Sequence, residues 1–197
     1  MEIARIEEGP FATNTYLVAE GERLVVIDPG FAGKSVTEAV ARAGADVEGV
    51  LVTHGHVDHV FSAMEVAEAV RAPLYFPGRD LELAAGEWEG LSYRRPEGFH
   101  DVKGGDVLHL LDRDVRVLAM PGHTPGEVSY LMGDMAFTGD TLFAGTIGRS
   151  VGPETEELLA SIRREILTLP DETRVFPGHG PATTVRTERL GNPFFIS

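Results

Sequence analysis

The chain has 197 residues, of which 43% are hydrophobic and 24% charged, a composition typical of one globular domain spanning residues 1–197. It contains no cysteine, which excludes disulfides, thiolate nucleophiles and thiolate metal ligands. The formal net charge of -14 argues against nucleic acid as a partner, because phosphate binding requires a basic face. The acidic N-terminal segment is unlike a signal peptide and no apolar run approaches a membrane span, so we expect a cytoplasmic protein with no membrane partner.

The first half of the chain alternates β-branched runs with helix-like stretches. A helix is expected over 34–43, closed by Gly44, because glycine readily adopts the left-handed conformation that ends helices. A second helix is expected over 60–71, where apolar residues recur at helical spacing. The region around Trp88 is expected to be irregular. Strands are expected over 13–19, 24–27, 49–52 and 74–76.

The second half is expected to contain further strands and one long helix. A helix is expected over 154–167, with Pro153 near its start and Pro170 beyond its end. Gly133-Asp134 is a signal for a two-residue hairpin. Strands are expected over 107–111, 115–119, 128–132, 135–137 and 174–176. Two packed sheets with helices outside would accommodate both the hairpins and the strand–helix alternation.

Three histidines and one aspartate lie within seven residues, directly after the strand expected over 49–52. Neutral imidazole is the commonest metal-ligand side chain, and aspartate supplies a hard oxygen donor. Each histidine needs partners for both ring nitrogens, so a cluster this dense is difficult to satisfy without a cation. The sequence therefore predicts a metal site built from His54, His56, Asp58 and His59.

Three further candidate ligands, His123, Asp140 and His179, each follow an apolar, strand-like run and are flanked by glycine or proline. Such residues form tight turns that hold a side chain at the end of a strand. The two remaining histidines lack this setting. His100 is expected to be a solvated loop residue, and His109 a strand residue without a chemical role.

Taken in order, the pattern His54-x-His56-x-Asp58-His59, His123, Asp140 and His179 resembles the metallo-β-lactamase superfamily across nearly the whole chain. The resemblance implies an α+β fold, the αββα sandwich, in which two packed mixed β-sheets carry helices on their outer faces and the metal site lies at one edge. The segments 121–126 and 139–143 are most similar to the glyoxalase II (hydroxyacylglutathione hydrolase) branch.

The resemblance also implies a cofactor of two divalent metal ions. Zinc is the preferred ion, and iron or manganese are also compatible with histidine and aspartate ligands. The implied ligands are His54, His56 and His123 for one ion, and Asp58, His59 and His179 for the other, with Asp140 bridging the two.

Two further residues are assigned roles by the same resemblance. Asp28 matches an acid near the ligand loop that would contact the ligands rather than the metal. A turn at Asp-Pro-Gly explains this residue equally well. Arg149 matches a basic residue after the bridging aspartate and is a candidate for binding a substrate carboxylate, although a surface arginine capping a loop carbonyl is equally compatible.

The chain departs from full-length glyoxalase II in its substrate contacts. Only eighteen residues follow His179, too few for the C-terminal helical extension that helps to hold glutathione. Val151 and Pro181 stand where that family has tyrosines. The chain therefore resembles the compact bacterial relatives of glyoxalase II, and the identity of its substrate is left open.

The expected reaction is hydrolysis of a small-molecule thioester or ester, of the S-lactoylglutathione type, by a hydroxide that bridges the metal ions. Asp58 would orient this nucleophile and receive its proton. The alternative is a mononuclear iron persulfide dioxygenase, an oxidoreductase on the same fold that would use His54, His123 and Asp140. Lactam hydrolysis, phosphoester hydrolysis and a scaffold with a dormant metal site are weaker alternatives, and the sequence does not specify the oligomeric state.

Overall fold

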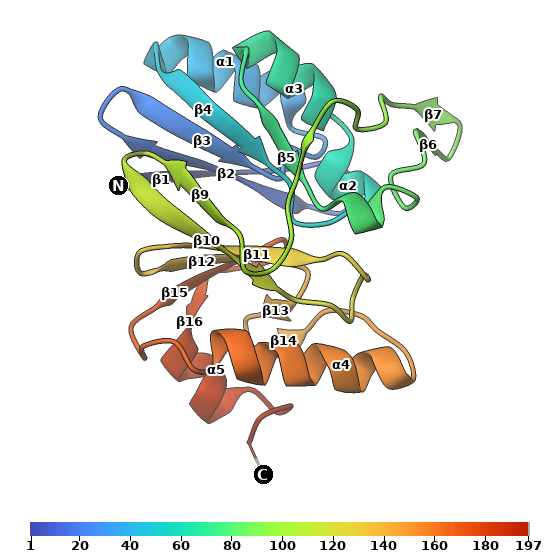
Figure 1. Ribbon diagram of the computed structural model, residues 1–197, viewed down its shortest axis with the longest axis vertical. Coiled ribbons are helices and arrows are strands. Elements are labelled where there is room, and N and C mark those ends of the chain that lie inside the picture. The colour runs from blue at the N-terminus through green and yellow to red at the C-terminus, as the bar shows by residue number, and fades with distance from the viewer. Residues whose placement is uncertain (197) are drawn as a thin grey trace.

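The computed structural model describes residues 1–196, which form four layers (Figure 1). Two six-stranded β-sheets pack face to face in the middle, and helices cover the outer face of each sheet. The predicted αββα sandwich is therefore confirmed. Among the residues described, no helix combines the length and apolar character needed to cross a membrane.

The elements have the following bounds. The first sheet contains β1 (Glu2–Glu8), β2 (Thr13–Glu20), β3 (Arg23–Ile27), β4 (Asp46–Leu51), β5 (Leu74–Phe76) and β8 (His100–Asp101). The second contains β9 (Val107–Leu110), β10 (Arg113–Ala119), β11 (Val128–Met132), β12 (Met135–Gly139), β15 (Arg174–Pro177) and β16 (Thr183–Thr184). Two small hairpins are formed by β6 (Glu87–Trp88) with β7 (Leu91–Ser92), and by β13 (Leu142–Phe143) with β14 (Thr146–Ile147). The helices are α1 (Gly33–Ala43), α2 (Val57–Val60), α3 (Ala63–Val70), α4 (Pro153–Ser161) and α5 (Val185–Gly191), with a 3-10 turn η1 (Gly78–Asp80) and a π-helical turn η2 (Ile162–Ile166).

Both sheets are mixed, and their order brings several strand ends to one edge. In the first sheet β1, β2 and β3 are antiparallel, whereas β3, β4, β5 and β8 run parallel. In the second, β9 to β12 form an antiparallel meander and β15 pairs in parallel with β12. Parallel pairing requires crossover connections, which contain α1, α3 and α4. Backbone hydrogen bonds from Val128 to Thr53 (3.0 Å) and from Asn14 to Gly178 (2.7 Å) join the two sheets where β4 and β15 end.

Three apolar clusters fill the spaces between the layers. Successive side chains of a strand point to opposite faces, so Val26 of β3 packs beneath α1 and α3 while its neighbour Val25 packs between the sheets. The third cluster lies between the second sheet and the C-terminal helices, and includes Leu158 and Ile162. Both faces of each sheet are thus buried, which explains why the central strands are almost wholly apolar.

The expected helix over 60–71 was wrong at its start. The structure has two helices there, and because α2 begins at Val57, Asp58 and His59 lie on a helical turn. The break between α2 and α3 is caused by a contact with a segment distant in sequence: Gly30 N–H donates to His59 O (3.1 Å) and Ser62 N–H donates to Gly30 O (2.9 Å). In a continuous helix, Ser62 N–H would donate to the carbonyl four residues earlier. Here it donates to Gly30 O instead, so the helix is interrupted.

Other differences concern short or edge elements. The expected helix over 154–167 is α4 continued by η2. The sequence did not predict β1, whose charged residues give no alternating pattern because it is an exposed edge strand. His100 lies in β8 rather than in a loop and is exposed. The other elements that were not predicted are β6, β7, β13, β14, β16 and α5.

The packing between the sheets generates a stability prediction. The Phe137 side chain is 1% exposed, and its ring centroid lies 5.4 Å from that of Tyr16 and 5.1 Å from that of Phe176. Phe137→Ala should lower the free energy of unfolding by about 3–5 kcal/mol in urea denaturation, because it leaves a cavity between the sheets. The control, Leu190→Ala at a 65% exposed position, should change it by less than about 0.5 kcal/mol. Equal effects of the two substitutions would contradict this account of the core.

Candidate metal centre

All seven predicted ligands converge at the edge where the two sheets meet, although they come from four separate segments. The segment after β4 and the adjoining α2 supply four of them, and the loops after β10, β12 and β15 supply one each. Their ligand atoms form overlapping groups of three, within each of which all atoms lie within 4.8 Å of one another. These groups are His54, His56 and His123; His54, His59 and Asp140; and Asp58, His59 and His179.

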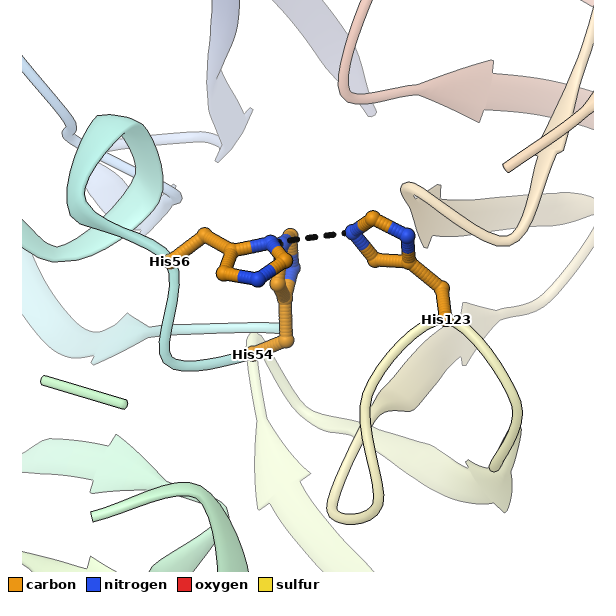
Figure 2. Close-up of side chains that lie close together, drawn as sticks. All are labelled: His54, His56 and His123. Atoms are coloured by element: carbon orange, nitrogen blue, oxygen red, sulfur yellow. Dashed lines mark hydrogen bonds between the residues drawn. The ribbon is translucent and has the colours of Figure 1, made fainter. Parts of the chain in front are cut away.

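The first group consists of three imidazoles whose ring nitrogens face one another (Figure 2). His56 Nδ1 lies 3.1 Å from His54 Nε2 and 3.0 Å from His123 Nε2. The outer nitrogen of His123, Nδ1, lies 2.7 Å from Arg149 O, and a carbonyl can only accept, so this nitrogen carries a hydrogen. His54 Nδ1 lies 3.1 Å from Thr53 Oγ1 and is anchored in the same way. In their neutral forms His54 and His123 therefore both present a lone pair to His56.

The other four candidate ligands, called the second group below, are two imidazoles and two carboxylates: His59, His179, Asp58 and Asp140. His179 Nε2 lies 3.2 Å from Asp58 Oδ2 and 3.4 Å from Asp140 Oδ2. His59 Nε2 lies 3.5 Å from Asp58 Oδ2 and 3.3 Å from Asp140 Oδ1. Both His59 Nε2 and Asp140 Oδ1 are buried without a hydrogen-bond partner. Asp140 Oδ2 also lies 3.7 Å from His123 Nε2, so this one carboxylate adjoins both groups.

Buried lone pairs without hydrogen-bond partners, aimed at a common point, fit a divalent cation. Histidine nitrogens and carboxylate oxygens are donors that suit zinc, iron and manganese. The outer ring nitrogens of four candidate ligands are held by other groups, as is usual for metal-binding histidines, because such contacts fix the ring and its tautomer. These four are His54, His59, His123 and His179. His59 Nδ1 lies 2.9 Å from Asp28 Oδ2, and His179 Nδ1 lies 3.1 Å from Phe11 O.

Asp28 both shapes a turn and contacts a predicted ligand. Its φ of 49° is in the left-handed region, at the Asp-Pro-Gly turn after β3. Its Oδ1 accepts from Thr53 N–H (2.8 Å), and its Oδ2 accepts from Thr53 Oγ1 (2.8 Å) and lies within hydrogen-bond distance of His59 Nδ1. Since the Thr53 hydroxyl hydrogen points to Asp28, Thr53 Oγ1 is free to accept from His54 Nδ1. Asp28 therefore orients two of the imidazoles, one directly and one through Thr53.

The charges of the centre shift the pKa values of its groups in opposite directions. Burial lowers the pKa of His54 well below its usual value. Burial also opposes protonation of His59, but the Asp140 and Asp28 carboxylates outweigh it and raise the pKa of that imidazole well above its usual value. Burial likewise opposes protonation of His179, but hydrogen bonds to Asp140 and Asp58 raise its pKa from 6.5 to about 10. A bound cation would replace these protons, so metal binding should release them.

Several supporting residues were not predicted from the sequence. The Thr13 hydroxyl donates to Asp58 Oδ2 (2.9 Å), and Glu127 Oε1 accepts from Asp140 N–H (2.8 Å). Burial, together with the negative charge of Asp140, raises the pKa of Glu127 well above its usual value. The position of Glu127 directly after the Pro121–Gly126 motif was the only available signal for it. Asp80, a fully buried aspartate in η1, had no such signal.

The remaining candidates lie at the rim or away from the centre. The Arg149 side chain is exposed, and its main-chain carbonyl is the partner of His123. Arg149 thus adjoins the centre through its backbone, and its guanidinium is open to solvent. His100 and His109 lie in β8 and β9, away from the ligand loops, and both are exposed.

This fold and ligand arrangement define a metal-binding enzyme of the αββα class. The family model of the metallo-beta-lactamase superfamily matches residues 9–179, so the chain belongs to that superfamily. The protein is 34% identical over 205 residues to "Probable metallo-hydrolase YqgX" of Bacillus subtilis, with 98% of this chain and 97% of the relative covered. It is 31% identical over 211 residues to the hydroxyacylglutathione hydrolase GloC of Haemophilus influenzae, with 100% and 99% covered.

Solved structures of the superfamily superpose over nearly the entire chain. A B3 metallo-beta-lactamase, BLEG-1, is 29% identical, with a TM-score of 0.90 and 100% of both chains covered. TTHA1623 in a di-iron-bound form is 36% identical, with a TM-score of 0.84 and 97% of this chain and 99% of that chain covered. ETHE1 from Myxococcus xanthus is 30% identical, with a TM-score of 0.79 and 98% and 84% covered.

The raised pKa of His179 predicts how the stability of metal-free protein depends on pH. Its folded-state pKa of about 10 lies above the ordinary 6.5, so its ion pairs with Asp58 and Asp140 stabilise the fold fully below pH 6.5. This contribution is lost as the pH rises to about 10. In chelator-treated protein, the difference in Tm between wild type and His179→Gln should therefore shrink over this range. A difference that stayed constant from pH 6.5 to 10 would contradict the proposed protonation of His179.

Proposed function

We propose that the protein is a dinuclear metal-dependent hydrolase that cleaves a glutathione-type thioester. The observation that carries the proposal is the pair of ligand groups joined at Asp140, with buried lone pairs facing inward and the outer ring nitrogens of four histidines anchored. The similarity to GloC over the whole chain supports a hydroxyacylglutathione substrate. In this proposal His54, His56 and His123 hold one ion, and Asp58, His59 and His179 hold the other, with Asp140 bridging them.

When bound, the two cations would lower the pKa of a shared water and polarise the substrate carbonyl. Asp58 is the group proposed to orient the attacking water, and the Thr13 hydroxyl holds its Oδ2 in place. Burial favours a neutral Asp58, but His179 and His59 outweigh it and lower its pKa. These causes belong to the metal-free protein, because a bound cation would displace the protons of His179 and His59. We assign Asp58 the task of orienting the attacking water and receiving its proton.

Arg149 is the proposed contact for the substrate. Its carbonyl is tied to His123, so its backbone is held beside the centre, and its exposed guanidinium can pair bidentately with a carboxylate such as those of glutathione. The absence of the family tyrosines, replaced by Val151 and Pro181, implies that fewer groups hold the carrier than in full-length glyoxalase II. The acyl group is therefore proposed only as a small hydroxyacyl of the lactoyl type.

Zinc is the proposed metal, and iron is the principal alternative because TTHA1623 has been solved in a di-iron form. The competing function is the mononuclear iron persulfide dioxygenase. That reaction needs only His54, His123 and Asp140, and leaves no role for the convergence of Asp58 and His179. The completeness of the second ligand group therefore favours the hydrolase.

Turnover and metal retention should be lost together when one ligand is removed. Wild-type protein should hydrolyse S-lactoylglutathione, and His123→Ala should lose that activity and at least one metal ion per chain, because the two remaining nitrogens of the three-histidine group cannot replace the third. His109→Ala is the matched control, since this histidine is 72% exposed in β9 and should keep full activity. Oxygen uptake with glutathione persulfide, without thioester hydrolysis, would favour the dioxygenase and contradict the proposal.

The role of Arg149 predicts a change in KM with little change in kcat. Arg149→Ala should raise the KM for S-lactoylglutathione roughly tenfold, the value expected for the loss of one charge-assisted contact worth about 1.4 kcal/mol. Arg42→Ala, at an exposed position of α1, is the control and should behave as wild type. An unchanged KM in Arg149→Ala would remove this residue from the substrate site.

A further inference from the structure

The three-histidine group requires two loops from different sheets to stay in fixed register. His54 and His56 follow β4 of the first sheet, whereas His123 follows β10 of the second. The nitrogens of His54 and His123 lie within 3.1 Å of His56 Nδ1, so a small displacement of either loop would open the group. Some interaction between the two loops must therefore fix their separation.

The side chain of Asp80 makes that connection. It is fully buried, with 0% exposure, at the end of the η1 turn that follows β5. Its Oδ2 accepts from Gly55 N–H (3.2 Å), which lies between His54 and His56, and from Thr124 Oγ1 (2.6 Å), which follows His123. Its Oδ1 accepts from Gly126 N–H (2.6 Å) of the same loop. All three donors thus belong to the two loops that carry the three histidines.

The backbones of both loops lie very close to Asp80, at Gly55 and at Gly126. A Cβ atom at Gly126 would lie 2.6 Å from Asp80 Oδ1, and a Cβ atom at Gly55 would lie 2.5 Å from the carbonyl oxygen of Asp80. Real Cβ atoms essentially never show separations below 3.0 Å, so a side chain at either position would force Asp80 or the loop to shift. The contact between Asp80 and the loops is therefore closely packed on both sides.

A buried carboxylate is costly unless its oxygens accept hydrogen bonds, and here each oxygen accepts at least one. The second ligand group has no such connection to Asp80: Asp58 is held by Thr13, His59 by Asp28 and His179 by Phe11 O. Any effect of Asp80 on metal binding should consequently fall on one position of the two.

We propose that Asp80 is a positioning residue that fixes His54 and His56 relative to His123 and so sets the affinity of the three-histidine position for its cation. The inference rests on the proposed metal ligands and does not depend on which substrate is hydrolysed. Removing the carboxylate would leave all three imidazoles present, but the distances between their nitrogens would no longer be fixed. Loss of such supporting contacts typically weakens metal binding by about 10- to 100-fold.

The test measures zinc bound per chain by elemental analysis, after equilibration against buffers of graded free zinc. Asp80→Asn keeps the volume of the side chain but places an amide N–H₂ group opposite at least one donor. Asp80→Asn is introduced into two background variants. His179→Ala retains the three-histidine metal position, and His56→Ala retains the position formed by Asp58, His59 and His179. In the first background it should weaken zinc binding by about 10- to 100-fold, and in the second it should have no effect.

Asp101→Asn is the matched control. The carboxylate of Asp101 accepts from Gly78 N–H (2.8 Å) at the start of the same η1 turn but makes no hydrogen bond to either ligand loop, so Asp101→Asn should leave zinc binding unchanged in both backgrounds. If Asp80→Asn does not fold, Thr124→Val, which removes one of the three donors, decides the question in the same two backgrounds. Equal weakening in both backgrounds, or none in either, would overturn the role of Asp80. Fewer than two zinc ions in the wild-type protein would overturn the proposed dinuclear centre itself.

Discussion

Buried lone pairs that face one another without enough hydrogens between them are the constraint on which the rest of this structure depends. His54 Nε2 and His123 Nε2 both face His56 Nδ1, which has at most one hydrogen to donate. His59 Nε2 and Asp140 Oδ1 are buried without a partner. Unsatisfied buried polar atoms cost free energy, so this arrangement is stable only if a cation binds there or if protons are taken up in its place. The rest of the fold must therefore hold these groups together against the cost of removing them from water and against the repulsion between their lone pairs.

The fold meets this requirement with strand ends and with buried acids that link neighbouring segments. The ligands follow β4, β10, β12 and β15, which are anchored in the two sheets and cannot shift without disturbing a closely packed core. Asp28 links the end of β4 to α2, Asp80 links the loops after β4 and β10, and Glu127 links the segment before β11 to the backbone of Asp140. Three acids that are not themselves predicted ligands thus perform one task, which is to fix ligand-bearing loops relative to one another.

The convergence of the seven candidate ligands could be predicted from the sequence because their signal is local: residue type, dense spacing between His54 and His59, and glycine or proline beside the later candidates. The central strands and their αββα arrangement followed from apolar runs and the family resemblance. The break between α2 and α3 could not be predicted, because the loop around Gly30, distant in sequence, takes up hydrogen-bonding groups that a continuous helix would use. Asp80 was missed for a similar reason: it stands alone in the sequence, and only the pairing of β5 with its neighbours brings it beside two ligand loops. Tertiary contacts of this kind leave no periodic pattern in the chain.

The most direct test of the dinuclear centre is anomalous diffraction from crystals of the metal-loaded protein, measured on both sides of the absorption edge of the bound metal. The account predicts two peaks, one among the nitrogens of His54, His56 and His123 and the other between Asp58, His59 and His179, with Asp140 contacting both. A single peak confined to His54, His123 and Asp140 in active protein would contradict the dinuclear centre and with it the proposed hydrolase mechanism.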